Sequence, residues 1–225
     1  MKRVAITRTL PDAERTAARL RALGAEPVLA PLLSIVPCAY DTNVDAAQAL
    51  LFTSAHGVRA FPDARAQRDR LVLTVGDATA EAARAAGFAN VRSADGDAAA
   101  LAALAASLLD PAAGPLIHIG GEHLAGDLAG QLRAAGFRVE RRVAYSARAA
   151  VALPAALSGP LDIVLFHSAR AAEILISLGA PGADGLTAAC LSPAVADAAR
   201  KVAWRRIIVA PAPREDVFLT AALSG

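Results

Sequence analysis

Short apolar runs alternate with longer, alanine-rich stretches of helical character along most of the chain. Four clear pairs are RVAI at 3–6 before 11–25, LVLTVG at 71–76 before 77–88, LIHIGG at 116–121 before 122–137, and DIVLF at 162–166 before 167–179. Glycine stands where a helix C-cap belongs in each of them, at Gly24, Gly87, Gly136 and Gly179. Strands that alternate with helices of about 10–15 residues are typical of βαβ units. The pattern therefore predicts an α/β fold with mostly parallel sheets.

Several segments recur later in the chain in the same order and at a nearly constant spacing. The matching pairs are 50–61 with 164–175, 74–88 with 190–204, and 20–28 with 132–140. Chance similarity in an alanine-rich chain is the alternative, and the preserved order argues against it. The spacing is far too long for a solenoid repeat. The sequence therefore predicts two similar domains, encoded by two tandem copies that join near 110–115.

Composition and charge restrict the class of protein. The 225 residues are 55 % hydrophobic and 20 % charged, enough for one large domain or two small ones. A net charge of +2 indicates neither a nucleic acid nor a membrane surface as partner. The longest apolar tract, 98–109, falls short of the roughly 20 residues of a membrane span. Because Cys38 and Cys190 are the only cysteines, we expect a soluble, cytoplasmic protein with reduced thiols.

Small polar residues and glycines gather at the turns that follow the predicted strands. They are Thr53, Ser54, Gly76, Asp77, Thr79, Gly120, Gly121, Ser168 and Ser192. Taken singly, each is explained as a helix cap or a turn residue. Taken together they predict a binding site, because two similar domains facing each other would direct these helix N-termini into one cleft. Free backbone N–H groups and helix dipoles suit a large, multiply anionic ligand.

Familiar catalytic signatures are missing from the chain. It has no G-x-G-x-x-G turn after a strand, no Walker lysine and no nucleophile elbow. The four histidines, His56, His118, His123 and His167, show no metal-ligand spacing, so no metal is expected. We interpret His56 and His167 as solvated loop residues that follow strands at equivalent places in the two copies.

Tyr145 differs from its counterpart in the repeat. It lies at the end of a predicted strand of the second copy and aligns with Leu33 of the first, so it is not a shared structural position. Two interpretations stay open at this point. Tyr145 is either a half-buried packing residue or a hydroxyl donor directed into the cleft.

Five segments together resemble the uroporphyrinogen-III synthase family over essentially the whole chain. They are FTSAHGVRAF, VGDATAEAARAAGF, GGEHLAGDLAGQLRAAGFRVERRVAYSA, VLFHSARAAEIL and LSPAVADAA. The resemblance implies two flavodoxin-like α/β domains with parallel sheets, a two-stranded connector and a cleft between the domains. One domain would comprise 1–33 and 149–225 and the other 37–145, with crossings near 31–37 and 143–149. Two duplicated copies that each cross once would give this interleaving.

The family's reaction converts hydroxymethylbilane, a linear tetrapyrrole rich in carboxylates, into uroporphyrinogen III with loss of water and inversion of ring D. The resemblance therefore implies a cyclising hydro-lyase of haem biosynthesis. No cofactor is needed, because an electron-rich pyrrole of the substrate supplies the electrons. Tyr145 would assist departure of the hydroxyl. The residues that would bind substrate carboxylates are Thr53, Ser54, Gly76, Thr79, Gly120, Gly121, Ser168 and Ser192, with Arg8 and Arg148 as weaker candidates.

The chain departs from the family pattern in two places. Ala194 and Val195 stand where many relatives have a threonine pair, so Ser192 carries that role or none does. His56 stands in the first motif where asparagine or proline is usual.

A non-catalytic two-domain binding protein for a polycarboxylate or tetrapyrrole ligand is the main alternative, since the chain lacks a catalytic dyad. A receiver-like regulatory module fits poorly, because Asp77 stands alone and the only lysines are Lys2 and Lys201. We expect a monomer, because no heptad or edge-strand pattern demands a partner. The sequence leaves open a transient contact with hydroxymethylbilane synthase, the preceding enzyme.

Overall fold

The computed structural model describes residues 1–124 and 126–224 and has the predicted α/β fold. The chain divides into two compact units. Unit 1 comprises Met1–Ser34 and Arg148–Gly225, and unit 2 comprises Ile35–Ala147. Each unit is therefore built around its own sheet.

The junction expected between the two sequence copies, near 110–115, does not coincide with a boundary between the two units. It lies inside unit 2, where the short 3-10 turn η1 (Pro111–Ala113) is found. Each unit therefore contains parts of both copies. Gly225, the last residue of the range expected for the discontinuous domain, lies outside the described residues. In the described part of the chain, no helix has the length and apolar character needed to cross a membrane.

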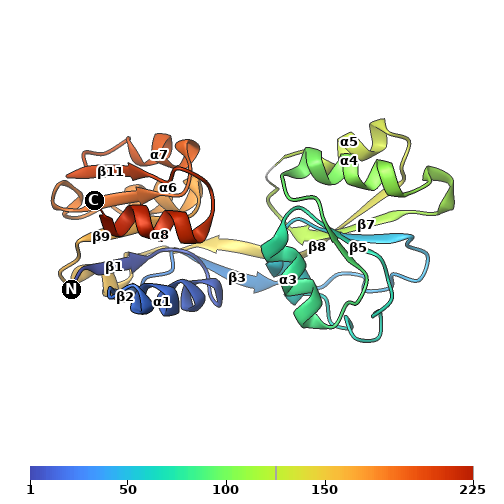
Figure 1. Cartoon of the computed structure of the whole chain (residues 1–225), viewed down its shortest axis with the longest axis horizontal. Helices are drawn as coiled ribbons and strands as arrows, with labels where there is room; N and C mark the ends of the chain where they lie inside the picture. Colours follow the sequence, from blue (N-terminus) through green and yellow to red (C-terminus); the bar gives the residue numbers. More distant parts are fainter. Residues whose placement is uncertain (125, 225) are drawn as a thin grey trace. The chain divides into compact units, whose positions relative to one another are not determined.

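Unit 1 contains a five-stranded parallel sheet in the order β11-β10-β9-β1-β2. Its strands are β1 (Arg3–Ile6), β2 (Glu26–Leu29), β9 (Ile163–Phe166), β10 (Thr187–Cys190) and β11 (Arg206–Val209). Its helices are α1 (Asp12–Ala22), α6 (Ala169–Ser177), α7 (Pro193–Ala199) and α8 (Glu215–Ser224). Helices α1 and α8 pack on one face of the sheet and α6 and α7 on the other (Figure 1). The central strands are consequently buried on both faces, which explains their continuous apolar sequences.

Unit 2 contains a six-stranded sheet in the order β3-β8-β7-β4-β5-β6. Its strands are β3 (Leu33–Pro37), β4 (Ala49–Phe52), β5 (Val72–Thr74), β6 (Val91–Ser93), β7 (Leu116–Gly121) and β8 (Val139–Ala149). Its helices are α2 (Ala55–Arg59), α3 (Asp77–Ala86), α4 (Ala98–Leu108) and α5 (Leu128–Ala134). Helices α2 and α3 pack on one face, and α4 and α5 lie side by side on the other (Figure 1). Both units are thus three-layer sandwiches.

Helix boundaries follow the local turn chemistry. The four glycines expected to end helices all have φ between 78° and 120°, which confirms the prediction. Helix α5 is shorter than the expected stretch 122–137 and begins at Leu128. Asp127 caps it by accepting a hydrogen bond from Gly130 N (2.9 Å). Gly126, with φ of 98°, is in a left-handed conformation that stops the helix from extending upstream.

The two sheets are built on the same plan, as the repeat predicts. Strands β9, β10 and β11 take the places in unit 1 that β4, β5 and β6 take in unit 2, and β1 corresponds to β7. The registers also correspond, because Val4 is opposite Ile163 and Leu116 is opposite Ala49. The next strand of each copy differs. It is interrupted at Pro31 in the first copy, giving β2 and β3, and is one continuous strand, β8, in the second.

The chain passes from unit 1 to unit 2 within β3 and returns within β8. Cys38 N donates to Ala144 O and Ala150 N donates to Leu32 O, both at 2.9 Å. Because one residue number rises as the other falls, β3 and β8 run antiparallel. The two hydrogen bonds are counterparts in the repeat, since Cys38 corresponds to Ala150 and Leu32 to Ala144. The duplicated sequence is thereby interleaved.

Candidate functional site

The turn residues of unit 2 follow neighbouring strands of one sheet. Strands β8, β7, β4 and β5 lie side by side and are parallel to one another. Their carboxyl ends therefore share one edge, the usual place for a ligand in an open α/β sheet. The candidates brought to this edge are Thr53, Ser54, Gly76, Thr79, Gly120, Gly121 and Tyr145.

Tyr145 packs across the end of β7. It is opposite Gly121, where the pairing of β7 and β8 shifts register, and only 9 % of the residue is exposed. A Cβ at Gly121 would lie 2.8 Å from two ring carbons and 3.0 Å from the hydroxyl oxygen of Tyr145. The half-buried imidazole of His56 contacts the same ring edge-on, with the ring centroids 5.7 Å apart. The ring therefore contacts both the backbone of Gly121 and the imidazole of His56.

His118 contacts Thr53 from the neighbouring strand β7, where its side chain is fully buried. Its Nε2 is 3.1 Å from Thr53 Oγ1, while Nδ1 is buried without a hydrogen-bond partner among the described residues. Burial, with a smaller contribution from the positive charge of Arg141, lowers the pKa of His118 to about 4. The imidazole is therefore neutral at neutral pH. Sequence reasoning considered His118 only as a metal ligand and missed its contact with Thr53.

The other turns of unit 2 are used partly as helix caps. Ser54 is the N-cap of α2, and its Oγ accepts a hydrogen bond from the first turn (3.2 Å). Gly76 is the N-cap of α3, and the N–H of Thr79 donates to its carbonyl (3.1 Å). Thr79 itself is only 6 % exposed. The exposed residues Asp77 and Ala78 precede it, and their N–H groups have no carbonyl acceptor within the helix.

Ser168 and Ser192 begin helices of unit 1 but differ in their hydrogen bonds. Ser168 Oγ accepts a hydrogen bond from Ala171 N (3.2 Å), so its hydroxyl caps α6. Ser192 is the N-cap of α7 without a side-chain cap bond, and Pro193 follows it at the first helical position. The hydroxyl of Ser192 is therefore the freer of the two to bind a ligand.

Arg8 and His167 belong to a charged cluster at the carboxyl ends of β1 and β9. Arg8 Nη1 lies 2.9 Å and His167 Nε2 lies 3.4 Å from the same oxygen of Glu215. Thr16 Oγ1 donates to the second oxygen of that carboxylate. Burial alone would raise the pKa of Glu215, but its contacts with His167, Thr16 and Arg8 lower it to about 2. Glu215 is therefore ionised and balances the charge of Arg8.

The interpretation of His167 as a solvated residue is wrong, because its side chain is only 8 % exposed and its ring packs edge-on against Phe218 (centroids 5.0 Å apart). Burial lowers the pKa of His167, and the contact with Glu215 partly opposes this shift. Arg148, by contrast, is exposed within β8.

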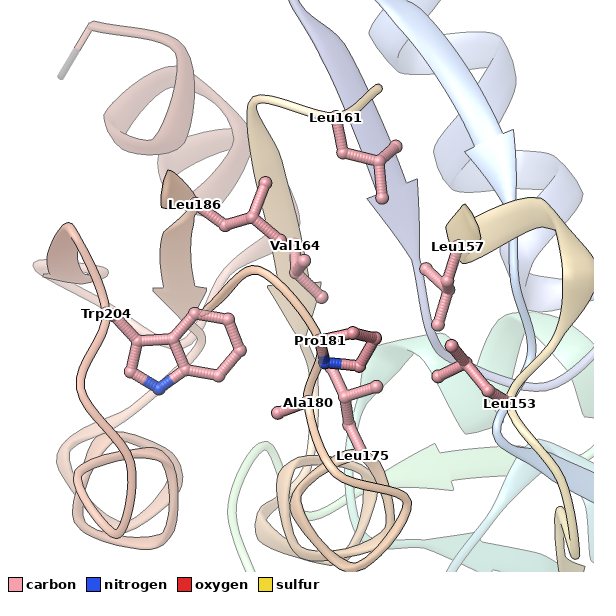
Figure 2. Close-up of a pocket in the computed structure, with 9 residues that line it drawn as sticks. All are labelled: Leu153, Leu157, Leu161, Val164, Leu175, Ala180, Pro181, Leu186 and Trp204. Carbon is pink, nitrogen blue, oxygen red and sulfur yellow. The ribbon is translucent and has the colours of Figure 1, made fainter. Parts of the chain in front are cut away.

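A small apolar pocket lies elsewhere in unit 1. Figure 2 shows its lining, which is made of aliphatic side chains with Pro181 and Trp204. Leu161 lies two residues before β9 and Leu186 one residue before β10, so the pocket is at the amino ends of the sheet. It offers no acid, base or nucleophile and lies at the opposite end of the strands from the candidate residues.

Comparison with known proteins indicates the same family as the sequence motifs. A family model described as uroporphyrinogen-III synthase HemD matches residues 14–219. A mutant uroporphyrinogen III synthase from Thermus thermophilus matches with a TM-score of 0.56 and 21 % identity, covering 100 % of this chain and 99 % of that chain. The uroporphyrinogen-III synthetase from Helicobacter pylori matches with a TM-score of 0.70 and 14 % identity, at the same coverage. These two structures establish the fold. No curated protein sequence matches significantly.

Proposed function

Since this chain belongs to the uroporphyrinogen-III synthase family, we propose that it cyclises hydroxymethylbilane with the residues at the carboxyl ends of its strands. The enzyme is a lyase of tetrapyrrole biosynthesis, and its product is uroporphyrinogen III. The contact of Tyr145 with Gly121 and His56 is the observation that carries the residue assignment. It supports the assignment because the phenol of Tyr145 lies at the sheet edge that also carries Thr53 and Ser54.

The reaction begins with loss of the terminal hydroxyl of hydroxymethylbilane as water. The adjacent pyrrole supplies the electron pair, and an azafulvene is left. The substituted carbon of ring D attacks this azafulvene to give a spiro intermediate, which fragments and closes again with ring D inverted. The protein must therefore hold the chain in a cyclic shape and assist the departing hydroxyl.

Tyr145 donates its phenolic proton in a hydrogen bond to the departing hydroxyl. Its ring packs against the backbone of Gly121 and the imidazole of His56. A donor held in this way needs no reorganisation when the C–O bond breaks. His56, where relatives have asparagine or proline, thus contributes by packing rather than by proton transfer.

Hydroxyl and amide groups bind the acetate and propionate side chains of the substrate. In unit 2 these groups are the hydroxyls of Thr53 and Ser54 and the first amides of α3 after Gly76. The positive end of the α3 dipole adds to the attraction. Thr79 helps to shape this turn from the inside, because its side chain is buried.

In unit 1, Ser192 and the exposed Arg148 serve further carboxylates. Ser168 contributes mainly by capping α6, and Arg8 contributes little, because its charge is already balanced by Glu215. Ala194 and Val195 provide no hydroxyl, so Ser192 carries the polar contact at that turn.

The domain boundaries suggested by the family, 1–33 with 149–225 and 37–145, describe the two lobes that act on the substrate. The enzyme works as a cytoplasmic monomer and receives hydroxymethylbilane from its synthase, through transient contact or free diffusion. Size-exclusion chromatography with light scattering tests the monomer, and titration with hydroxymethylbilane synthase tests the contact.

A coupled assay tests the function. Hydroxymethylbilane is generated in situ with hydroxymethylbilane synthase, the protein is added, and the oxidised porphyrin isomers are separated by chromatography. Spontaneous closure gives isomer I, so a protein-dependent change to isomer III is the expected result. Persistence of isomer I with folded protein, together with tetrapyrrole binding, would instead support a non-catalytic binding protein.

A further inference from the structure

Strand β7 directs alternate side chains to opposite faces of the unit 2 sheet. Leu116 packs in the cluster that contains α4 and α5, whereas Ile117 and Ile119 pack in the cluster that contains α2 and α3. By the two-residue period of a strand, His118 and Gly120 share the face of Leu116. His118 is thus a polar residue in the middle of an otherwise apolar layer.

The imidazole of His118 leans along the strand towards its carboxyl end. A Cβ at Gly120 would lie 3.0 Å from His118 Nε2, so the ring occupies the space that a side chain at Gly120 would fill. Nε2 reaches Thr53 Oγ1 on the neighbouring strand-end turn at 3.1 Å. The other copy of the repeat has no such pair, because Ile6 takes the place of His118 and His167 that of Thr53. The contact is therefore specific to unit 2.

The direction of this hydrogen bond depends on which nitrogen carries the proton. A neutral imidazole has one N–H and one acceptor nitrogen. Nδ1 is buried without a partner among the described residues, so a proton on Nδ1 would leave an N–H donor unsatisfied. Buried donors without a partner are rarer than under-satisfied acceptors. A proton on Nε2 would instead have a partner, because Nε2 can donate it to Thr53 Oγ1. The Nε2 tautomer is therefore favoured.

We infer that His118 is a positioning residue that donates its Nε2 proton to Thr53 Oγ1 and so directs the Thr53 hydroxyl proton outward to a substrate carboxylate. The inference rests on the proposed function of the Thr53 turn. A threonine hydroxyl has one proton and can either donate it inward or offer it to a ligand. When Nε2 is protonated it cannot accept a hydrogen bond, so the Thr53 hydroxyl proton remains available to a ligand.

The tautomer is measured directly on the full-length protein by ¹⁵N NMR of its histidine rings at neutral pH. The His118→Ile variant, which introduces the residue of the other copy, identifies the His118 signals by their loss. Protonated Nε2 and unprotonated Nδ1 are the expected result. A proton on Nδ1 would overturn the inference, and the measurement does not depend on activity or on the substrate.

A double-mutant cycle tests whether His118 acts through Thr53. We expect His118→Ile and Thr53→Val each to raise KM for hydroxymethylbilane about tenfold, the effect of about one lost hydrogen bond, with kcat within about twofold of the parent. The double variant should be no worse than either single one. His118→Gln, whose amide can still donate, should recover most of the loss.

Multiplying effects in the double variant, to about a hundredfold, would mean that the two residues act independently. If His118→Ile does not fold, Gly120→Ala, which crowds Nε2, replaces it in the cycle. A parent protein that gives no isomer III would overturn the proposed function, whereas an active parent with the Nδ1 tautomer would overturn this inference alone.

Discussion

The aromatic ring of Tyr145 lies against the α-carbon of Gly121, closely enough that a Cβ there would come within 2.8 Å of two ring carbons. Gly120, the residue before it, likewise leaves room for the imidazole of His118 on the opposite face of the strand. Because these two glycines at the end of β7 have no side chain, the rings of His118 and Tyr145 can pack there. No left-handed φ is involved at either position.

Gly121→Ala should displace the Tyr145 ring and lower turnover. Distances below 3.0 Å cannot be kept, and the ring carbons cannot bend away as the end of a flexible side chain could. We expect kcat/KM to fall tenfold or more, about the effect of losing one positioned donor. The coupled assay measures turnover, and near-UV circular dichroism reports on the tyrosine environment. Gly185→Ala is the control, because a Cβ there meets nothing within 4 Å; equal losses in both variants would contradict the explanation.

Tyr145→Phe removes the hydroxyl and keeps the ring. Since the packing against Gly121 and His56 involves mainly the ring, the free energy of unfolding should change by less than about 1 kcal/mol. Turnover should slow by about tenfold or more if the phenol assists departure of the hydroxyl. Steady-state rates at saturating substrate measure this effect. Unchanged turnover in a folded variant would remove Tyr145 from the chemistry.

Ser168→Ala and Ser192→Ala should change different properties: the first should lower stability, and the second should raise KM. Ser168 caps α6 through Ala171 N, so its replacement should lower the free energy of unfolding by about 1 kcal/mol. Ser192 makes no side-chain cap bond, so its replacement should leave stability nearly unchanged and raise KM a few-fold. Urea unfolding and the coupled assay on both variants make the comparison. The same stability loss in both variants would show that Ser192 is also a cap.

The free energy of unfolding should fall as pH is lowered from about 6.5 to about 4. His118 has an ordinary pKa of 6.5, and burial followed by the charge of Arg141 lowers it to about 4 in the folded protein. In this window the unfolded chain binds a proton that the folded chain does not, so unfolding is favoured by up to about 3 kcal/mol. Above the window the contribution is fully present, and below it the loss is complete.

Urea unfolding of the parent and of His118→Ile across this range measures the effect. The slope of stability against pH should be smaller in the variant. It should not vanish, because burial lowers the pKa of His167 as well, and that side chain titrates in the same direction. Identical slopes in the two proteins would contradict a buried, neutral His118.

The periodicity of the sequence was sufficient for the fold but not for the inner contacts of the site. Alternating strand and helix patterns and the four C-cap glycines are local signals, and the structure confirms them. His118 and Thr53 are far apart in sequence, and only the register of β4 against β7 brings them together. The pattern LIHIGG indicates that His118 lies in a strand, but it does not indicate which residue of a neighbouring strand the imidazole contacts.

His167 illustrates the same limit. It follows a strand, as a loop residue would, but Glu215 and Phe218 of α8 cover it. These partners come from the far end of the chain, and nothing in the sequence around His167 indicates them. The spacing of Gly120 two residues after His118 was the one local sign that a large side chain lies along β7.

The pairing of β3 with β8 also bears on how such a protein arose. A polypeptide with only the first copy would supply β4, β5 and β6 of one sheet but would lack the strand that β7 provides beside β4. A second molecule could fill that place with its own first strand, giving a domain-swapped dimer. Fusion of two genes would turn this exchange between molecules into one within a single chain, at a high effective concentration of the partner strand. Tyr145 and Leu33 would then be equivalent positions, in two originally identical copies, that have since diverged.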